Sequence, residues 1–175
     1  QLHILSVCFA VKRLERSWGG TAGNIAYAMR CLEADPTILS SVGSDGGAYL
    51  ERLQQLGIRT TSIYQDSTIL TAAAHIMTDK ANNQITAFFS GPLEKTGVIS
   101  LKDQKRDTSS LVLVSPNPKE VMAKHLLEAK ELGIKGVFDP GQQITTFSPD
   151  ELRTGIEHAW AVVGNDYEMK LLAER

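Results

Sequence analysis

The stretch "GGTAGNIAYAMRCLEADPTILSSVGSDGGAYLERLQQLGI", residues 19–58, decides the fold because the spacing of its apolar residues changes along its length. After the two glycines, apolar residues recur three and four positions apart, which predicts a helix that Pro36 ends. The run "TILSSVG" (37–43) predicts a short buried strand, and "AYLERLQQLG" (48–57) predicts a second helix with Gly57 as its C-cap. Alternating helices and strands of these lengths indicate an α/β protein.

The adjacent glycines, Gly19 and Gly20, allow two interpretations. Tandem glycines permit positive φ and let another atom approach the backbone where a Cβ would block it, which suits a ligand. Alternatively, the pair is a turn into the helix and Gly23 is a close packing contact, and the residues alone favour this second interpretation. The predicted apolar face of the helix consists of Ala22, Ile25, Ala26, Met29 and Leu32.

The rest of the chain predicts a hairpin and then a regular alternation of strands and helices. "TAAAHIMTD" and "QITAFFSG" are strand-like runs joined by the polar "KANN", and "LHILSVCF" (2–9) predicts an earlier strand. Later strands are predicted in "SLVLVS", "KGVFDPG" and "AWAVVGN", and helices over 119–132, over 150–158 and from 166 onward. This alternation indicates a parallel sheet covered on both faces, with the hairpin and the first strand appended as a flap.

The composition excludes several classes of protein. With 175 residues, of which 42% are hydrophobic and 22% charged, the chain can form one domain with a core. A formal net charge of −2 gives no basic surface for a nucleic acid, and no apolar run approaches the ~18 residues of a membrane span. The two cysteines form no CxxC pair, which favours a reducing, cytoplasmic location, and the four histidines form no zinc motif.

Small, polar or turn-forming residues follow four of the predicted strands: "GSD" (43–45), "SPNP" (115–118), "DPG" (139–141) and "GND" (164–166). In an open parallel sheet, ligands bind beyond the carboxyl ends of the strands. We therefore expect an α/β enzyme with its site along this edge, although such loops also occur where nothing binds. Neither GxGxxG nor GxxxxGK[ST] is present, which argues against a Rossmann dehydrogenase and a P-loop enzyme.

Three stretches, taken in order, resemble the ribokinase-like, or PfkB, family of carbohydrate and nucleoside kinases, most closely its bacterial adenosine-kinase-like members. They are residues 19–58, "NNQITAFFSG", and "FDPGQQITTFSPDEL" followed by "VVGNDYEM". The first has a glycine pair and an Asn, then a strand ending in Gly-x-Asp, and the last contains Asn-x-x-Glu, here Asn165 to Glu168. The resemblance covers nearly the whole chain, but the family's first strand and its C-terminal "GAGD"-type segment have no counterpart in it.

The resemblance implies a three-layer α/β/α sandwich with a mainly parallel sheet and a small β lid that closes over the sugar. It assigns residues 1–18 to a lid strand region, 19–69 and 92–175 to the α/β core, and 70–91 to the lid hairpin. It also implies an ATP- and Mg²⁺-dependent kinase for a primary hydroxyl of a nucleoside, with adenosine as the first choice, or of a sugar. The alternative is a non-catalytic sugar or nucleoside sensor on the same fold.

The resemblance implies five residues in or beside the acceptor site. Gly19, Gly20 and Asn24 would hydrogen-bond the hydroxyls of a sugar or ribose, because glycine exposes its N–H and an Asn amide both donates and accepts. Gly43 and Asp45 would shape the adjoining loop. The structural alternatives are that Asn24 is the N-cap of its helix and that Asp45 caps the next helix.

A second group of residues would serve the phosphates. Asn165 and Glu168 match the motif with which the family organises Mg²⁺ and the phosphates through water, and Asp139 ends a strand near the expected phosphates. Asp-Pro-Gly is also a common turn. Without the family, Asn165 or Asp166 is more simply a helix cap, and Glu168 is an exposed first-turn charge that the helix dipole favours.

The lid supplies further candidates. Phe9, Phe88 and Phe89 could contact a base, although alternation predicts that residues 88 and 89 point to opposite faces and that at least one belongs to the core. Exposed lid strands often pair with another subunit, which suggests a homodimer through the lid. No catalytic residue is expected within the chain, because the family's base is an Asp of the "GAGD"-type segment. We therefore expect the 175 residues to be inactive alone.

Overall fold

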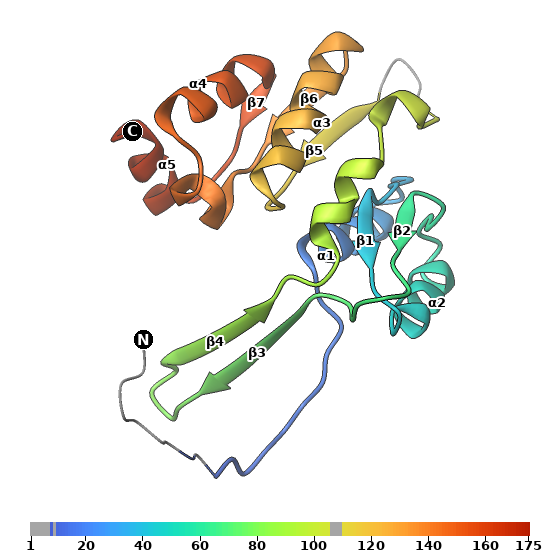
Figure 1. Ribbon diagram of the computed structural model, residues 1–175, viewed down its shortest axis with the longest axis vertical. Helices are drawn as coiled ribbons and strands as arrows, with labels where there is room; N and C mark the ends of the chain where they lie inside the picture. The colour runs from blue at the N-terminus through green and yellow to red at the C-terminus, as the bar shows by residue number, and fades with distance from the viewer. Residues whose placement is uncertain (1–7, 9, 106–109) are drawn as a thin grey trace.

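The computed structural model describes residue 8, residues 10–105 and residues 110–175 of the chain (Figure 1). The strand predicted over 2–9 lies outside these residues apart from Cys8, and the candidate Phe9 lies outside them as well. The described elements form an N-terminal α/β part, a hairpin and a C-terminal α/β part.

The N-terminal α/β part contains two helices and two short strands. They are α1 (Thr21–Cys31), β1 (Ser40–Val42), α2 (Gly47–Gln55) and β2 (Ile63–Gln65). The strands β1 and β2 pair in parallel, and the buried core around them consists of Ala26, Ile38, Leu53 and Ile58. Gly57 has a φ of +71°, which confirms it as the residue that ends α2. The sequence did not predict β2, because three residues are too few to show an alternating pattern.

The helix α1 buries fewer residues than its apolar spacing predicts. Ala26 is buried as expected, but Met29 and Leu32 are 38% and 81% exposed. The helix packs on α2 through small residues, with Gly23 against the side chain of Tyr49. The prediction for Met29 and Leu32 is therefore wrong for the described residues, since no described element covers that side of α1.

The predicted hairpin is confirmed. Its strands β3 (Ala73–Thr78) and β4 (Gln84–Phe89) are antiparallel, with Ala73 opposite Phe89. The turn is held by Asp79, whose Oδ1 accepts hydrogen bonds from the backbone N–H groups of Ala81 and Asn83 at 2.8 and 2.9 Å. The hairpin extends away from both α/β parts (Figure 1), and every residue of β4 is exposed.

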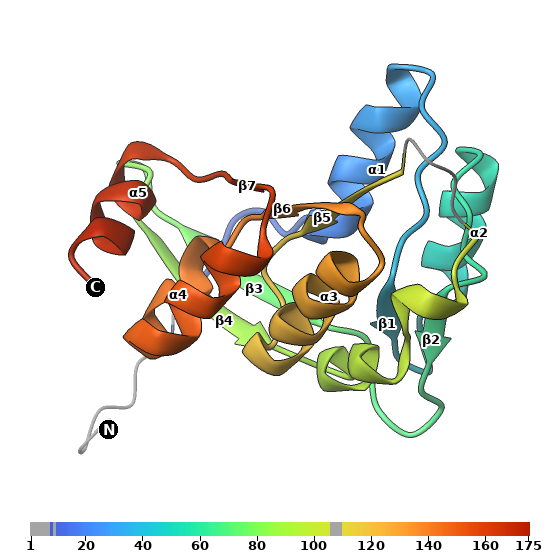
Figure 2. The same cartoon turned by 90° about the horizontal axis from the view of Figure 1, so that it is seen from above.

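The C-terminal α/β part is a three-stranded parallel sheet with its helices. Its elements are β5 (Leu111–Val114), α3 (Lys119–Glu131), β6 (Lys135–Phe138), α4 (Pro149–His158), β7 (Ala161–Val162) and α5 (Asp166–Ala173). Short 3₁₀ helices lie before and within it: η1 (Leu93–Val98), η2 (Leu101–Asp103) and η3 (Gly141–Thr145). The strand β6 lies between β5 and β7, and α3 and α4 cover the same face of the sheet (Figure 2). Phe138 and Phe147 meet edge to face in the core, with ring centroids 6.1 Å apart.

The arrangement of the strands confirms the predicted α/β class. Each predicted strand from β5 to β7 and each predicted helix from α3 to α5 is present, and Gly133 with a φ of +67° ends α3. The described strands nevertheless form two separate parallel ladders and one antiparallel pair, rather than one continuous sheet.

Candidate functional site

A cavity of about 410 Å³ lies beyond the carboxyl ends of β5, β6 and β7. The residues that line it include Thr21, Pro116, Asp139, Gln142, Asn165 and Glu168. Thr21 is the first residue of α1, so residues of both the N-terminal and the C-terminal α/β parts line the cavity. Three of the four loops predicted at this edge, "SPNP", "DPG" and "GND", line the cavity, whereas "GSD" does not.

Asn165 and Glu168 form a reciprocal cap at the start of α5. The side-chain Oδ1 of Asn165 accepts a hydrogen bond from the Glu168 N–H at 2.9 Å, and Glu168 Oε2 accepts one from the Asn165 N–H at 3.0 Å. The simpler structural interpretation, that Asn165 caps this helix, is therefore confirmed. Both side chains also line the cavity, and Glu168 Oε1 makes no hydrogen bond within the described part of the chain.

Asp139 lies on the β6 side of the cavity and is half-buried. Burial raises the pKa of its carboxyl group, the nearby Glu168 carboxylate raises the pKa further, and a hydrogen bond from the Gly141 backbone opposes them. Gly141 has a φ of +47°, and a Cβ on it would lie 2.6 Å from Pro116 Cγ. This turn therefore requires glycine, and it holds the β6 loop against the β5 loop. The carboxylates of Asp139 and Glu168 lie beside it, and two neighbouring carboxylates favour binding of a cation.

The glycine pair lies at the N-terminus of α1, next to the cavity. Gly20 is the N-cap, with φ +92° and ψ 130°, and the helix has no side-chain cap. Asn24 is inside the helix, in its second turn, so the alternative that Asn24 is the N-cap is wrong. The Asn24 side chain is exposed and makes no hydrogen bond to the described residues. Gly19, Gly20 and Asn24 are not among the lining residues, and only the adjoining Thr21 reaches the cavity.

The loop with Gly43 and Asp45 contacts the entry to the hairpin. Asp45 Oδ1 accepts a hydrogen bond from the Thr71 N–H at 2.8 Å, and the Gly43 N–H donates one to Thr71 Oγ1 at 2.9 Å. The hydrogen bonds from Thr71 lower the pKa of Asp45. The N-cap of α2 is Gly46 without a side-chain cap, so the alternative that Asp45 caps this helix is wrong.

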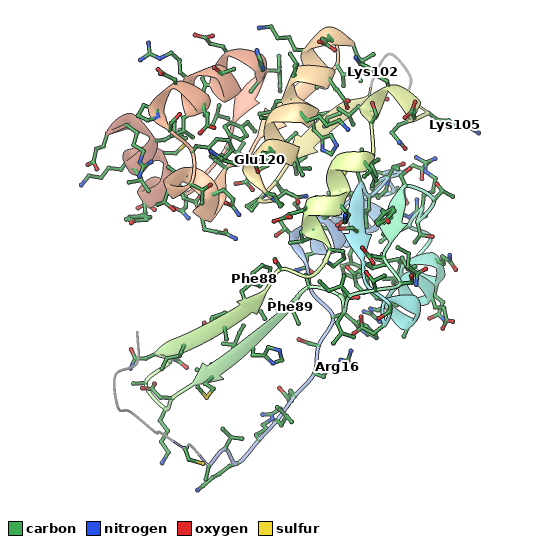
Figure 3. The ribbon with its side chains drawn as sticks, in the orientation of Figure 1. Arg16, Phe88, Phe89, Lys102, Lys105 and Glu120 are labelled. Carbon is green, nitrogen blue, oxygen red and sulfur yellow. The ribbon has the colours of Figure 1, made fainter. Side chains whose placement is uncertain are left out.

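Phe88 and Phe89 lie at the base of the hairpin, where β4 ends (Figure 3). They pair with Ala74 and Ala73 respectively, which places the two rings on opposite faces as alternation predicts. Phe88 is 63% exposed and Phe89 42% exposed. The expectation that at least one belongs to the core is therefore wrong for the described residues, because no described element covers either face of the hairpin.

Sequence reasoning did not single out Thr21 or Gln142 as site residues. Each directly follows a predicted feature, the glycine pair and "DPG", and that adjacency was the available signal. In the described part of the chain, no group of three or more His, Cys, Asp or Glu side chains is placed to hold a metal ion. None of the described helices combines the length and apolar character needed to cross a membrane. Cys8 and Cys31 are both exposed free thiols.

Comparison with known proteins identifies the family. Residues 6–175 match the model of the pfkB family carbohydrate kinases, so the chain belongs to the PfkB family. It is 30% identical over 165 residues to a nucleoside kinase of Thermoplasma acidophilum and 27% identical over 180 residues to one of Methanothermobacter thermautotrophicus. These alignments cover 94% and 95% of this chain and 54% of each relative, so the chain spans about half the length of the curated relatives it matches.

Solved structures confirm the predicted ribokinase-like fold. A nucleoside kinase of Burkholderia thailandensis, solved in complex with inosine, has a TM-score of 0.89 and 36% identity, covering 98% of this chain and 56% of that one. The nucleoside kinase of Methanocaldococcus jannaschii, an archaeal member of the ribokinase family, has a TM-score of 0.88 and 26% identity, covering 99% and 57%. The α/β architecture and the resemblance to the PfkB family are therefore both confirmed.

Proposed function

We propose that the complete protein is a kinase that transfers the γ-phosphate of ATP to a primary hydroxyl of a nucleoside. The observation that carries the proposal is the cavity, where the start of α1 meets the Asn165–Glu168 cap at the carboxyl ends of the strands. The Burkholderia thailandensis kinase, solved with inosine and also as an ADP-inosine complex, supports a nucleoside acceptor and ATP as the donor. We propose a purine nucleoside, with adenosine tested first and inosine beside it.

In this proposal the acceptor lies against the N-terminus of α1. The Gly20 N–H and the Asn24 amide would hydrogen-bond the ribose hydroxyls, since neither has a hydrogen-bond partner among the described residues and glycine leaves the backbone accessible. Gly19 completes the turn, while Gly43 and Asp45 would act indirectly by fixing Thr71 at the base of the hairpin lid. The residue ranges given above for the core and the lid are part of the same proposal.

Asn165, Glu168 and Asp139 would serve the phosphate side of the site. Mg²⁺ keeps several of its waters and needs only one or two carboxylates. Glu168 Oε1, which makes no hydrogen bond to the described residues, and the Asp139 carboxyl group fit that requirement. When bound, Mg²⁺ would neutralise charge on the phosphates. The catalytic base would be an Asp outside the 175 residues, and closure of the hairpin would exclude water from the acceptor.

The test is acceptor-dependent ADP formation by the complete protein with ATP and Mg²⁺. Adenosine, inosine, ribose and fructose are compared, and we expect a nucleoside to give the highest kcat/KM. Asn24→Ala should raise the KM for the nucleoside roughly 10-fold by removing hydrogen bonds to its hydroxyls. Gln55→Ala, which removes an exposed amide from α2, should leave the KM unchanged. If no acceptor increases ADP formation above the ATP-only background, the kinase proposal is wrong, and nucleoside binding by a sensor becomes the alternative to measure.

We also propose that the protein forms a homodimer through the hairpin. One face of the hairpin carries Met77, Ile85 and Phe89, which are 43%, 64% and 42% exposed. The opposite face carries the polar side chains of Thr78, Gln84 and Thr86, together with Ile76 and Phe88, which are 53% and 63% exposed. An exposed, largely apolar strand face of this kind favours association with a second copy.

A further inference from the structure

Tyr49, in the first turn of α2, connects that helix to the turn that precedes α1. Its Oη donates a hydrogen bond to the Gly19 carbonyl oxygen at 2.9 Å. Its ring also packs against the ring of Trp18, with centroids 5.7 Å apart and planes tilted by 31°. The Tyr49 backbone N–H is bonded to the Gly46 carbonyl at 3.0 Å, so the side chain extends toward α1 from a formed helical turn. One side chain of α2 therefore contacts both residues that precede Gly20.

The turn at the glycine pair depends on this contact because α1 has no side-chain cap. Gly20 occupies the N-cap position with a φ of +92° and offers no side chain. Its carbonyl accepts a hydrogen bond from the Asn24 N–H at 3.0 Å, but its own N–H donates none to the described residues. The orientation of the peptide unit between Gly19 and Gly20 is therefore fixed chiefly by the hydrogen bond from Tyr49.

The geometry of that peptide unit determines where the Gly20 N–H points. The described part of the chain contains no cis peptide bond, so the unit is trans. In a planar trans unit, the carbonyl and the following N–H point in opposite directions. Because Tyr49 holds the Gly19 carbonyl on the α2 side, the Gly20 N–H is directed away from α2, where a ligand hydroxyl can accept it.

Gly23 provides the space that the Tyr49 hydroxyl occupies. A Cβ on Gly23 would lie 1.9 Å from Tyr49 Oη and 3.2 Å from Cζ. The sequence therefore predicted correctly that Gly23 is a close packing contact. Burial raises the pKa of the Tyr49 phenol, so the group stays protonated and remains a hydrogen-bond donor at neutral pH.

We propose that Tyr49 is a positioning residue for the acceptor: it fixes the direction of the Gly20 N–H without touching the acceptor itself. The proposal rests on the proposed function, in which Gly20 and Asn24 bind a nucleoside. Loss of the Tyr49 hydroxyl should therefore weaken use of the nucleoside and leave use of ATP unchanged, because the proposed function assigns the phosphates to the cavity-lining residues Asn165 and Glu168.

The first experiment compares Tyr49→Phe with Tyr27→Phe in the complete protein. Tyr27 is 49% exposed on α1, so the control removes the same atom from the surface. Tyr49→Phe should raise the KM for the nucleoside roughly 3- to 10-fold, with the KM for ATP within about twofold of wild type. Tyr27→Phe should change neither constant. A Tyr49→Phe protein with both KM values unchanged, or with both raised equally, overturns the proposal.

The second experiment is a double-mutant cycle between Tyr49 and Gly23. Gly23→Ala should displace the hydroxyl and raise the nucleoside KM as Tyr49→Phe does. The double variant should be no worse than either single variant, because phenylalanine has no hydroxyl to collide with the new Cβ and its Cζ at 3.2 Å needs only a small shift. Additive increases in KM would contradict the proposal.

The same measurements separate the two proposals. If the wild type shows no acceptor-dependent turnover, the proposed function fails and the role of Tyr49 fails with it. If the wild type is active and Asn24→Ala raises the nucleoside KM while Tyr49→Phe does not, the proposed function stands and only the role of Tyr49 is overturned.

Discussion

At Asp139, two effects oppose ionisation. The carboxyl group is half-buried, and the Glu168 carboxylate lies near it, so its pKa is raised above the ordinary value. A carboxyl group with a higher pKa in the folded chain than in the unfolded chain binds protons more readily when folded. The free energy of unfolding therefore decreases as the pH rises from about 4, the ordinary value of an aspartate, through the higher folded pKa.

We expect Asp139→Asn to raise the melting temperature of the complete protein at pH 7. The gain should be no more than about 2 °C, because the group keeps contact with solvent. It should vanish near pH 3, where the wild-type carboxyl group is protonated in both states. Thermal unfolding at pH 3 and pH 7 measures the effect, with Glu157→Gln on α4 as an exposed control. A lower melting temperature at pH 7, or an equal gain in the control, contradicts the expectation.

Among the elements, α4 and α5 begin in the same way, and this permits a matched test. Ser148 and Glu151 form a reciprocal cap at α4, as Asn165 and Glu168 do at α5. Only the cap of α5 lines the cavity. If the α5 cap also serves the phosphates, its removal should lower activity, whereas removal of the α4 cap should affect stability alone.

Asn165→Ala and Ser148→Ala should each lower the free energy of unfolding by about 1 kcal/mol, the usual cost of losing an N-cap. Only Asn165→Ala should also raise the KM for ATP, because only this variant removes a cap side chain that lines the cavity. Denaturant unfolding and steady-state kinetics of the complete protein measure the two effects. Equal kinetic constants in the two variants would mean that Asn165 has a capping role alone.

Local chemistry explains which elements were predictable. Gly57 and Gly133 end helices with positive φ, and "KANN" joins two alternating runs, so α2, α3 and the hairpin could be predicted from the sequence. The exposure of Leu32 could not, since apolar spacing identifies a face but not whether another element covers it. The same limit applies to Phe88 and Phe89.

At the scale of the whole molecule, the cavity joins segments that are far apart in sequence. The carboxyl-end rule predicted the loops around Asp139 and Asn165, because both follow strands of one sheet. It failed for "GSD", which follows a strand of the other ladder and contacts Thr71 instead. Thr21 was missed because no local pattern predicts that the N-terminus of α1 lies against a sheet whose first strand begins only at Leu111.

The hairpin exposes apolar side chains in a defined register on both faces, and Thr78, Gln84 and Thr86 are interspersed with them on one of the two. Met77 lies directly opposite Ile85, and Phe89 lies on the same face nearer the base. The neighbouring residue Thr86 lies on the other face. Ile85→Asp and Thr86→Asp therefore each introduce one negative charge at adjacent residues of β4, but on opposite faces of the hairpin.

We expect the complete protein to be a dimer and Ile85→Asp to be a monomer. A buried, unpaired carboxylate in an apolar interface is costly, and Ile85 lies in the proposed interface. Thr86→Asp replaces a side chain that is already polar, on the opposite face beside Ile76, and should leave a dimer formed through the Met77, Ile85 and Phe89 face intact. Light scattering after size-exclusion chromatography gives the mass of each variant, and thermal unfolding shows whether each is folded. A wild-type monomer would exclude the dimer. Dissociation by Thr86→Asp with retention of the dimer in Ile85→Asp would instead place the interface on the opposite face of the hairpin.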